Sequence, residues 1–330
     1  MERFALAAAV VLGFALTAAL CSLFVPLRRV LERREQQRPV QSEQPRPAPL
    51  RAPLWGGLCA AAGTVAAVGV GWLAACVGQP ELLGSEGRLM TRLLTALAGS
   101  LAFGAVGFAE DLARIRSPAA LGLRRDVRLL LEALAAAFVL LLLRAAGCLP
   151  RGLGVPGAGY VLLGSAVPFL WAVLMVALAE CARIAERDEG AVCGVAFVAM
   201  LALMMVEAGL GVSGLAVLPG ALAGALVALG LWAFPPARLG VGCCGSLLAA
   251  GAVGCIPLSL DMTSLTVPLA LPFWAAGGLL AAQLLCAKRT GKPLRCWVKK
   301  HKMSPETVFL CSFALSAVGY VLALALLRWC

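Results

Sequence analysis

Long apolar stretches separated by short polar segments run through all 330 residues of this chain. Each apolar stretch is long enough to cross ~30 Å of hydrocarbon as a helix, although the third is near the lower limit. Because backbone groups in lipid must pair within the chain, the pattern predicts an all-α bundle of about ten transmembrane helices. The predicted spans are 4–25, 53–77, 93–109, 127–148, 159–179, 190–209, 213–234, 242–260, 265–287 and 307–327.

Two polar segments interrupt the pattern, but neither divides the chain into separate domains. Residues 34–52 are rich in Pro and Gln without an apolar period, which predicts a loop. Residues 288–306 form a second, basic loop. We therefore expect one integral membrane domain over residues 1–330. The first span is expected to be a retained helix, because Leu20 precedes Cys21 where signal-peptide cleavage requires a small residue.

Composition supports this interpretation and excludes a soluble globular domain. The chain is 61% hydrophobic and only 14% charged, with a mean hydropathy of +0.92. The 13 cysteines lie mostly inside predicted helices, as Cys21 and Cys59 do, and their spacing matches neither a zinc site nor a disulfide framework.

The distribution of basic residues predicts the orientation in the membrane. Of the 28 lysines and arginines, 22 lie in the first, third, fifth, seventh and ninth loops. The positive-inside rule places these loops in the cytoplasm and both termini outside. The net charge of +11 then faces the anionic inner leaflet. Nucleic acid is not an expected partner, because the basic residues are not interleaved with aromatic ones.

The same loops contain candidate chemistry. Glu110 and Asp111 are adjacent carboxylates at the end of a predicted helix. Such a pair suits Mg²⁺ or a Mg²⁺-diphosphate, but the spacing alone favours a helix end whose acids balance Arg114 and Arg116. The segment CARIAERDEG, residues 181–190, gathers five ionisable groups between apolar stretches. The seventh loop ends in a Gly-rich turn that favours either a phosphate cradle or a tight reversal.

Taken in order, these segments resemble the phospho-N-acetylmuramoyl-pentapeptide transferase family, polyprenyl-phosphate sugar-1-phosphate transferases of glycosyl transferase family 4. PLWGG (53–57) is similar to the family's P-T-M-G-G, and GFAEDL to G-F-x-D-D-x. LGLRRDVRLLLE (121–132) resembles L-G-L-x-x-K-x-K-L-L-L-Q, which places Arg128 on a lysine. The resemblance implies a divergent member.

The later loops continue the resemblance with more departures. RIAERDEGAVCG (183–194) is similar to N-L-T-D-G-L-D-G-L-A-x-G, with Glu186 and Glu189 on the two aspartates and Arg183 on the asparagine. In PPARLGVGCCGSLLAAG (235–251), the glycine-serine pair of the family matches, but a cysteine replaces the metal-binding aspartate. KPLRCWVK resembles A-P-L-H-H-H-F-E, with Arg295, Cys296 and Trp297 in place of three histidines. The residues that match the glycine-serine pair and replace the aspartate are Gly245, Ser246 and Cys243.

The resemblance implies a fold, a reaction and a site. The reaction is Mg²⁺-dependent transfer of a phosphosugar from a UDP-amino sugar nucleotide to undecaprenyl phosphate at the cytoplasmic face of the bacterial inner membrane, in cell-wall synthesis by a possible homodimer. It assigns catalysis to four acids, phosphate binding to four further residues and the metal to Asp111 and Glu186, with Cys243 at a ligand position. The acids are Glu110, Asp111, Glu186 and Glu189, and the phosphate-binding residues are Arg128, Gly245, Ser246 and Arg295. Because the charge distribution places their loops on one face, the four acids and Cys243 are expected to converge on one cytosolic cleft.

The departures leave two hypotheses open. A thiol is a soft ligand that suits Mg²⁺ poorly, and Arg183 adds a cation that can replace the metal as counter-charge. The chain is thus either an enzyme with altered ligands or a non-catalytic paralogue that binds a lipid phosphate or acts as a scaffold. A transporter is a third, disfavoured class: it would make the loop matches a coincidence, and the intramembrane acids Glu132 and Glu207 that suggest it lie near predicted helix ends, where they cost little.

Overall fold

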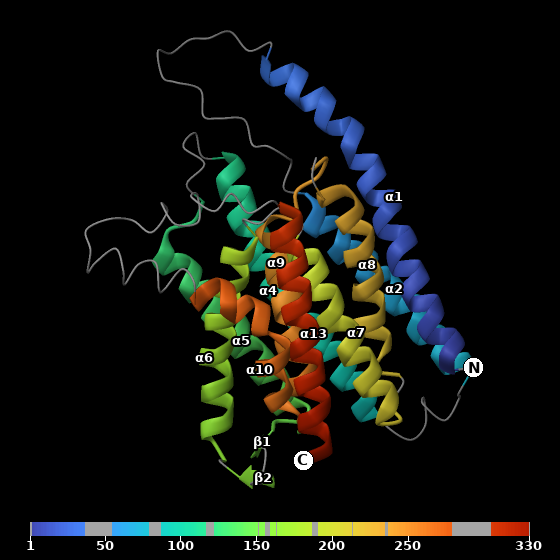
Figure 1. Ribbon diagram of the computed structural model, residues 1–330, viewed down its shortest axis with the longest axis vertical. Helices are drawn as coiled ribbons and strands as arrows, with labels where there is room; N and C mark the ends of the chain where they lie inside the picture. Colours follow the sequence, from blue (N-terminus) through green and yellow to red (C-terminus); the bar gives the residue numbers. More distant parts are fainter. Residues whose placement is uncertain are drawn as a thin grey trace.

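The computed structural model describes most of the chain and is almost entirely helical (Figure 1). The described residues are 2–36, 55–78, 87–116, 122–150, 152–155, 159–162, 164–186, 191–212, 214–234, 237–278 and 305–329. The helices that precede the one small sheet of this part are α1 (Glu2–Gln36), α2 (Gly56–Gly78), α4 (Gly87–Arg116) and α5 (Arg125–Ala145). Those that follow it are α6 (Ala166–Ala185), α7 (Ala191–Gly209), α8 (Val217–Ala233), α9 (Gly242–Ser259), the 3₁₀ turn η1 (Thr263–Leu265), α10 (Thr266–Leu269) and α13 (Pro305–Trp329).

Seven of these helices are long and apolar enough to cross a membrane, which confirms a polytopic α-helical membrane protein. They are α1, α2, α4, α6, α7, α9 and α13. The predicted count of ten is not reached in the described part of the chain. Helix α5 is of similar length but carries Arg128, Glu132 and Arg144, while α8 has only 17 residues.

Helix α9 is the centre of the bundle. All of its residues are buried, and it packs against α2, α4, α6 and α7 (Figure 1). Its sequence contains no charged residue, and small residues let neighbouring backbones approach closely. A Cβ on Gly57 of α2 would collide with the backbone of Gly245, and one on Gly107 of α4 would collide with the carbonyl of Cys243. The glycines therefore allow the backbones of α2 and α4 to pack closely against the first turn of α9.

Two predicted spans need correction, and the first is 159–179. Its first residues form the strand β2 (Gly159–Leu162), which pairs with the preceding strand β1 (Gly152–Val155) through Gly154 and Tyr160 among others, and the helix begins only at Ala166. Tyr160 donates a hydrogen bond to Asp261 at 2.9 Å, which ties the hairpin to the turn after α9. The apolar count did not distinguish strand from helix because β2 is itself apolar.

The second correction concerns the span 265–287. Its described part is broken into η1, α10 and a further helical stretch at 271–278. Pro272 has no backbone N–H and its ring disfavours a helical contact with the carbonyl of residue 268, and the helix is interrupted at Ala270 and restarts with Pro272 in its first turn. The polar loop predicted at 34–52 also begins later, since α1 extends to Gln36. Most of the basic loop 288–306 lies outside the described residues.

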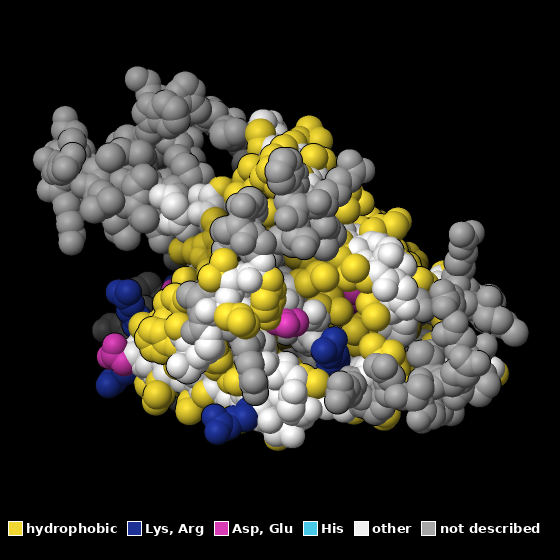
Figure 2. Space-filling model, turned by 90° about the horizontal axis from the view of Figure 1, so that it is seen from below, with side chains coloured by type: hydrophobic (Ala, Val, Ile, Leu, Met, Phe, Trp, Pro, Cys, Tyr) yellow, Lys and Arg dark blue, Asp and Glu magenta, His cyan; other side chains and the backbone are white. Residues whose placement is uncertain are grey.

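Successive long helices alternate in direction, so connections from opposite ends of the bundle can be distinguished. Both termini lie at the end that carries the β1–β2 hairpin (Figure 1). Figure 2 views the molecule from that end, where the coloured surface is mainly hydrophobic with a few scattered charged side chains. The polar side chains described next lie at the opposite end, where α4 and α6 finish and α5 and α9 begin.

Candidate functional site

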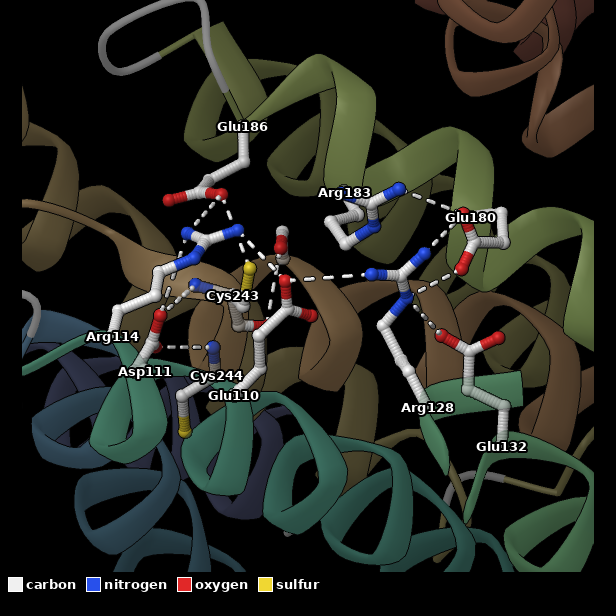
Figure 3. A network of polar contacts seen from close by, with 11 residues as sticks. Glu110, Asp111, Arg114, Arg128, Glu132, Glu180, Arg183, Glu186, Cys243 and Cys244 are labelled. Carbon is white, nitrogen blue, oxygen red and sulfur yellow. Dashed lines mark hydrogen bonds and ion pairs between the residues drawn. The ribbon is translucent and has the colours of Figure 1, made fainter. Parts of the chain in front are cut away.

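Four helix ends bring together ten side chains that form one polar cluster (Figure 3). The members from α4 and α5 are Glu110, Asp111, Arg114, Arg128 and Glu132. The members from α6 and α9 are Glu180, Arg183, Glu186, Cys243 and Cys244. The convergence predicted for Glu110, Asp111, Glu186 and Cys243 is therefore present, while Glu189 and Arg295 lie outside the described residues.

Asp111 closes the start of α9. Its Oδ1 accepts a hydrogen bond from the Cys243 N–H at 3.0 Å, and its Oδ2 accepts one from the Cys244 N–H at 2.9 Å. The first N–H groups of a helix have no partner within it and attract negative charge. Asp111 is buried, with 2% of its surface exposed. Its two oxygens therefore cap the N-terminus of α9 from the neighbouring helix α4.

One half of the cluster surrounds Arg114. We call Asp111, Arg114, Glu186 and Cys243 the Arg114 group. Arg114 binds Glu110 at 2.8 Å, one helical turn before it on α4. Its Nη1 lies 3.4 Å from Glu186 Oε2 and 3.8 Å from Asp111 Oδ1. The Cys243 thiol donates to the same Glu186 oxygen at 3.2 Å. The guanidinium thus sits between the two carboxylates that the family resemblance assigns to metal.

Arg128 is the cation of the other half, the Arg128 group (Arg128, Glu132, Glu180 and Arg183). Its Nε and Nη2 donate to the two oxygens of Glu180 at 2.7 and 3.2 Å, a bidentate pair. Arg183 donates to Glu180 at 2.8 Å. Glu132 is fully buried, has no hydrogen bond to either oxygen, and approaches Arg128 only at 4.0 Å.

Glu110 links the two groups. Its Oε1 accepts from Arg114 and lies 3.8 Å from Arg128 Nη1, while its Oε2 is buried without a hydrogen bond. Adjacent residues on a helix point about 100° apart, which explains why Asp111 faces α9 and Glu110 faces α5. The two adjacent carboxylates therefore contact different helices, and their oxygens do not converge on one point.

Three potential metal ligands lie close together, but their chemistry does not suit Mg²⁺. One ligand atom each from Asp111, Glu186 and Cys243 lie within 4.8 Å of one another. Mg²⁺ requires hard oxygen ligands in octahedral geometry, and a thiol is a soft ligand. Both Asp111 oxygens already accept from α9, and the guanidinium of Arg114 touches two of the three ligands. The residues present therefore do not fit the metal that the resemblance implies.

The residues aligned with the glycine-serine pair of the family lie inside the bundle. Gly245 is buried against Gly57, and the Ser246 hydroxyl donates to the carbonyl of Cys243 at 3.1 Å. Both are thus used in packing the first turns of α9. The phosphate-binding roles predicted for them remain predictions.

Two pairings differ from the sequence-based expectation. Arg183 was expected to serve as the counter-charge beside the family acids, but it binds Glu180, and Arg114 occupies that position instead. Glu180 was missed because the predicted helix ended at residue 179, whereas α6 continues to Ala185. A useful signal was the spacing of Glu180 and Arg183, which are three residues apart and so share a helix face.

The fold and the cluster define a polytopic membrane protein with buried acids and arginines at one end of its bundle. Residues 93–261 match the model of Glycosyl transferase family 4, and the chain belongs to this family. The resemblance seen in the loop motifs is thereby confirmed.

Two relatives carry the name phospho-N-acetylmuramoyl-pentapeptide-transferase. The protein from Desulforudis audaxviator (strain MP104C) is 32% identical over 168 residues, which cover 48% of this chain and 50% of that protein. This alignment thus spans about half the length of the relative. The protein from Geobacillus kaustophilus (strain HTA426) is 25% identical over 308 residues, covering 92% of this chain and 89% of the relative. The low identities agree with a divergent member.

Proposed function

We propose that this chain is a non-catalytic member of the family, which binds a polyprenyl phosphate at the cytoplasmic membrane face without Mg²⁺-dependent phosphosugar transfer. The observation that carries this proposal is the position of Arg114 between Asp111 and Glu186, with the Cys243 thiol on the same Glu186 oxygen. Transfer of a phosphosugar from a UDP-linked donor requires cations that stabilise developing phosphate charge. Here a guanidinium already lies between the two carboxylates that would hold such a metal.

Phosphate binding is supported by the exposure of the arginines. The side chains of Arg114 and Arg183 are 21% and 16% exposed, whereas that of Arg128 is 9% exposed. A guanidinium presents several donors in a planar fork, so a partly exposed arginine can bind a carboxylate and a phosphate oxygen together. The two more exposed arginines are therefore the candidate contacts for a lipid phosphate.

The surface next to these arginines suits a prenyl chain. Helix α5 carries exposed apolar residues at a spacing that places them on one face, beginning beside Arg128. They are Val127, Leu130, Leu134, Phe138 and Leu141. A lipid with its phosphate at the cluster would continue along this face into the hydrocarbon. The same face is equally suited to ordinary membrane lipid, so the headgroup must supply selectivity.

The second candidate is the family reaction itself, with a UDP-amino sugar as donor. It is favoured by one observation: Glu110, Asp111 and Glu186 still lie in one cluster at the helix ends, although glutamates replace two aspartates. For this reaction Arg114 would have to leave the two carboxylates. The two candidate functions therefore differ in the position of Arg114: it stays between the carboxylates if the protein only binds lipid, and it moves away if the protein catalyses transfer.

The test measures turnover and binding with the same purified protein. We expect negligible Mg²⁺-dependent release of UMP from UDP-N-acetylmuramoyl-pentapeptide, the donor that the family resemblance implies, together with saturable binding of undecaprenyl phosphate in detergent. Cys243→Asp should not restore release, because Arg114 and the remaining departures persist and catalytic groups act non-additively. Robust release that Asp111→Asn abolishes would return the chain to the enzyme class. Absence of lipid binding would contradict the binding role.

The proposal also includes an orientation and a compartment. With the cluster facing the cytoplasm of the bacterial inner membrane, both termini are outside, in agreement with the distribution of basic residues. Single cysteines introduced at residues 40 and 300 in a cysteine-free background should be protected from a membrane-impermeant thiol reagent in intact cells. Labelling of either cysteine from outside would show that the predicted topology is wrong. A homodimer remains a prediction from the family.

A further inference from the structure

We propose that Arg114 occupies the place of a divalent cation in the cluster and excludes such cations from a latent site made by Asp111, Glu186 and Cys243. Arg114 would thus be a built-in counter-ion of the cluster. This inference concerns metal binding alone and does not depend on which lipid or nucleotide the protein binds. Besides the unsuitable thiol, the guanidinium of Arg114 is thus a second reason why the cluster does not suit Mg²⁺.

The geometry supports this assignment directly. Arg114 Nη1 is 3.8 Å from Asp111 Oδ1 and 3.4 Å from Glu186 Oε2, so it contacts one oxygen of each carboxylate that a metal there would use. A third acid, Glu110, fixes the other nitrogen of the guanidinium at 2.8 Å. A metal would therefore meet a positive charge that is held in position by three carboxylates.

Charge repulsion is strong in such surroundings. Asp111 and Glu110 are each 2% exposed, and Glu186 has 12% of its side chain exposed. Charges a few ångströms apart at a partly buried site repel with several times the energy they have in water. Displacing Arg114 would also leave three acids without their common cation. Both effects oppose metal entry while the arginine remains in place.

The donor set predicts which cation would bind if the guanidinium were removed. Two carboxylate oxygens and one sulfur suit a borderline or soft ion such as Zn²⁺, with Co²⁺ as its absorbing analogue. On binding, the Cys243 thiol would release its proton to water and coordinate as thiolate. The same three residues offer Mg²⁺ only two hard ligands. The latent site is therefore thiophilic, in contrast to the site implied by the family.

The experiment titrates the purified full chain with Co²⁺ and records thiolate-to-cobalt charge-transfer absorption. Wild type should show no band that depends on Cys243. Arg114→Met should bind Co²⁺ on the order of a hundredfold more tightly, through removal of one positive charge beside the metal. The double variant Arg114→Met/Cys243→Ser should lose the band. Arg116→Met is the matched control, because Arg116 is an exposed arginine on the same helix, and it should behave as wild type.

Two outcomes would overturn the proposal. The first is a band in the wild-type protein that Cys243→Ser abolishes, which would show that Arg114 does not exclude the metal. This comparison remains decisive even if Arg114→Met fails to fold. The second is a folded Arg114→Met protein, judged by its thermal transition, that binds Co²⁺ no more tightly than wild type. That result would show that the three residues do not form a latent site.

Discussion

The two halves of the polar cluster are built on the same principle but are anchored differently. In the Arg114 group, Asp111 binds two backbone N–H groups of α9, so the cluster is attached to the central helix of the bundle. In the Arg128 group, Glu180 binds only side chains, Arg128 and Arg183, and is itself 24% exposed. The first half is therefore part of the packing of the core, and the second is a network that rearranges at lower cost.

The largest expected effect is that of Asp111→Asn. The asparagine oxygen can accept from one of the two α9 N–H groups, but its NH₂ group faces the other. A buried donor left unpaired costs about 1–3 kcal/mol, and the loss of a charged acceptor adds to this. We expect the thermal transition in detergent to fall by several degrees. Asp126→Asn, at an exposed position of α5, is the control and should stay within about 0.5 kcal/mol.

The next effect tests whether α9 is held by close backbone contact. Gly57→Ala places a methyl group against the backbone of Gly245, so α2 and α9 must separate. Overpacking of this kind costs about 1–3 kcal/mol. Gly69→Ala is the matched control on the same helix, since a Cβ there meets nothing within 4 Å. It should leave stability unchanged or raise it slightly. Equal losses in both variants would refute the packing account.

Within the Arg128 group, two glutamates should behave in opposite ways. Glu180→Gln removes the charge that binds two arginines and should destabilise the fold by about 1–2 kcal/mol. Glu132→Gln replaces a buried carboxylate that has no hydrogen bond and should be neutral or stabilising. Thermal unfolding of both variants side by side gives the comparison. A larger loss for Glu132→Gln would mean that its contact with Arg128 matters more than the hydrogen bonds of Glu180.

The smallest effect concerns Cys243. Serine retains a donor for the Glu186 oxygen at nearly the same volume, so Cys243→Ser should change stability by less than about 1 kcal/mol. Cys311→Ser, at an exposed position of α13, provides the control in the same assay. A loss as large as that of Asp111→Asn would show that the sulfur has a structural role that its hydrogen bond does not explain.

Much of this architecture is predictable because membrane helices alternate in direction. The position of Glu110 and Asp111 at a helix end, and the order of the polar loops, correctly predicted that these acids would meet Glu186 and Cys243. The limits of the helices were less predictable where the chain stays apolar. The hairpin strand β2 and the interruption before Pro272 both lie inside apolar stretches that are as long as a membrane span.

The pairing of charges was not predictable from the sequence. Several arginines and acids lie in or beside the third and fifth loops, and which of them pair depends on helix rotation and length. Arg183 binds Glu180 because α6 continues past residue 179 and places the two on one face. Arg114 reaches Glu186 on a helix far along the chain. Sequence order therefore predicted which segments meet, and only the structure assigned the partners.

The most direct test of the central claim is an experimental structure of the protein soaked with Mn²⁺, recorded with anomalous scattering. The account predicts that Arg114 remains between Asp111 and Glu186, with Asp111 bound to the first N–H groups of α9 and no anomalous peak in the cluster. A Mn²⁺ peak coordinated by Asp111 and Glu186, with the Arg114 guanidinium turned away, would contradict it.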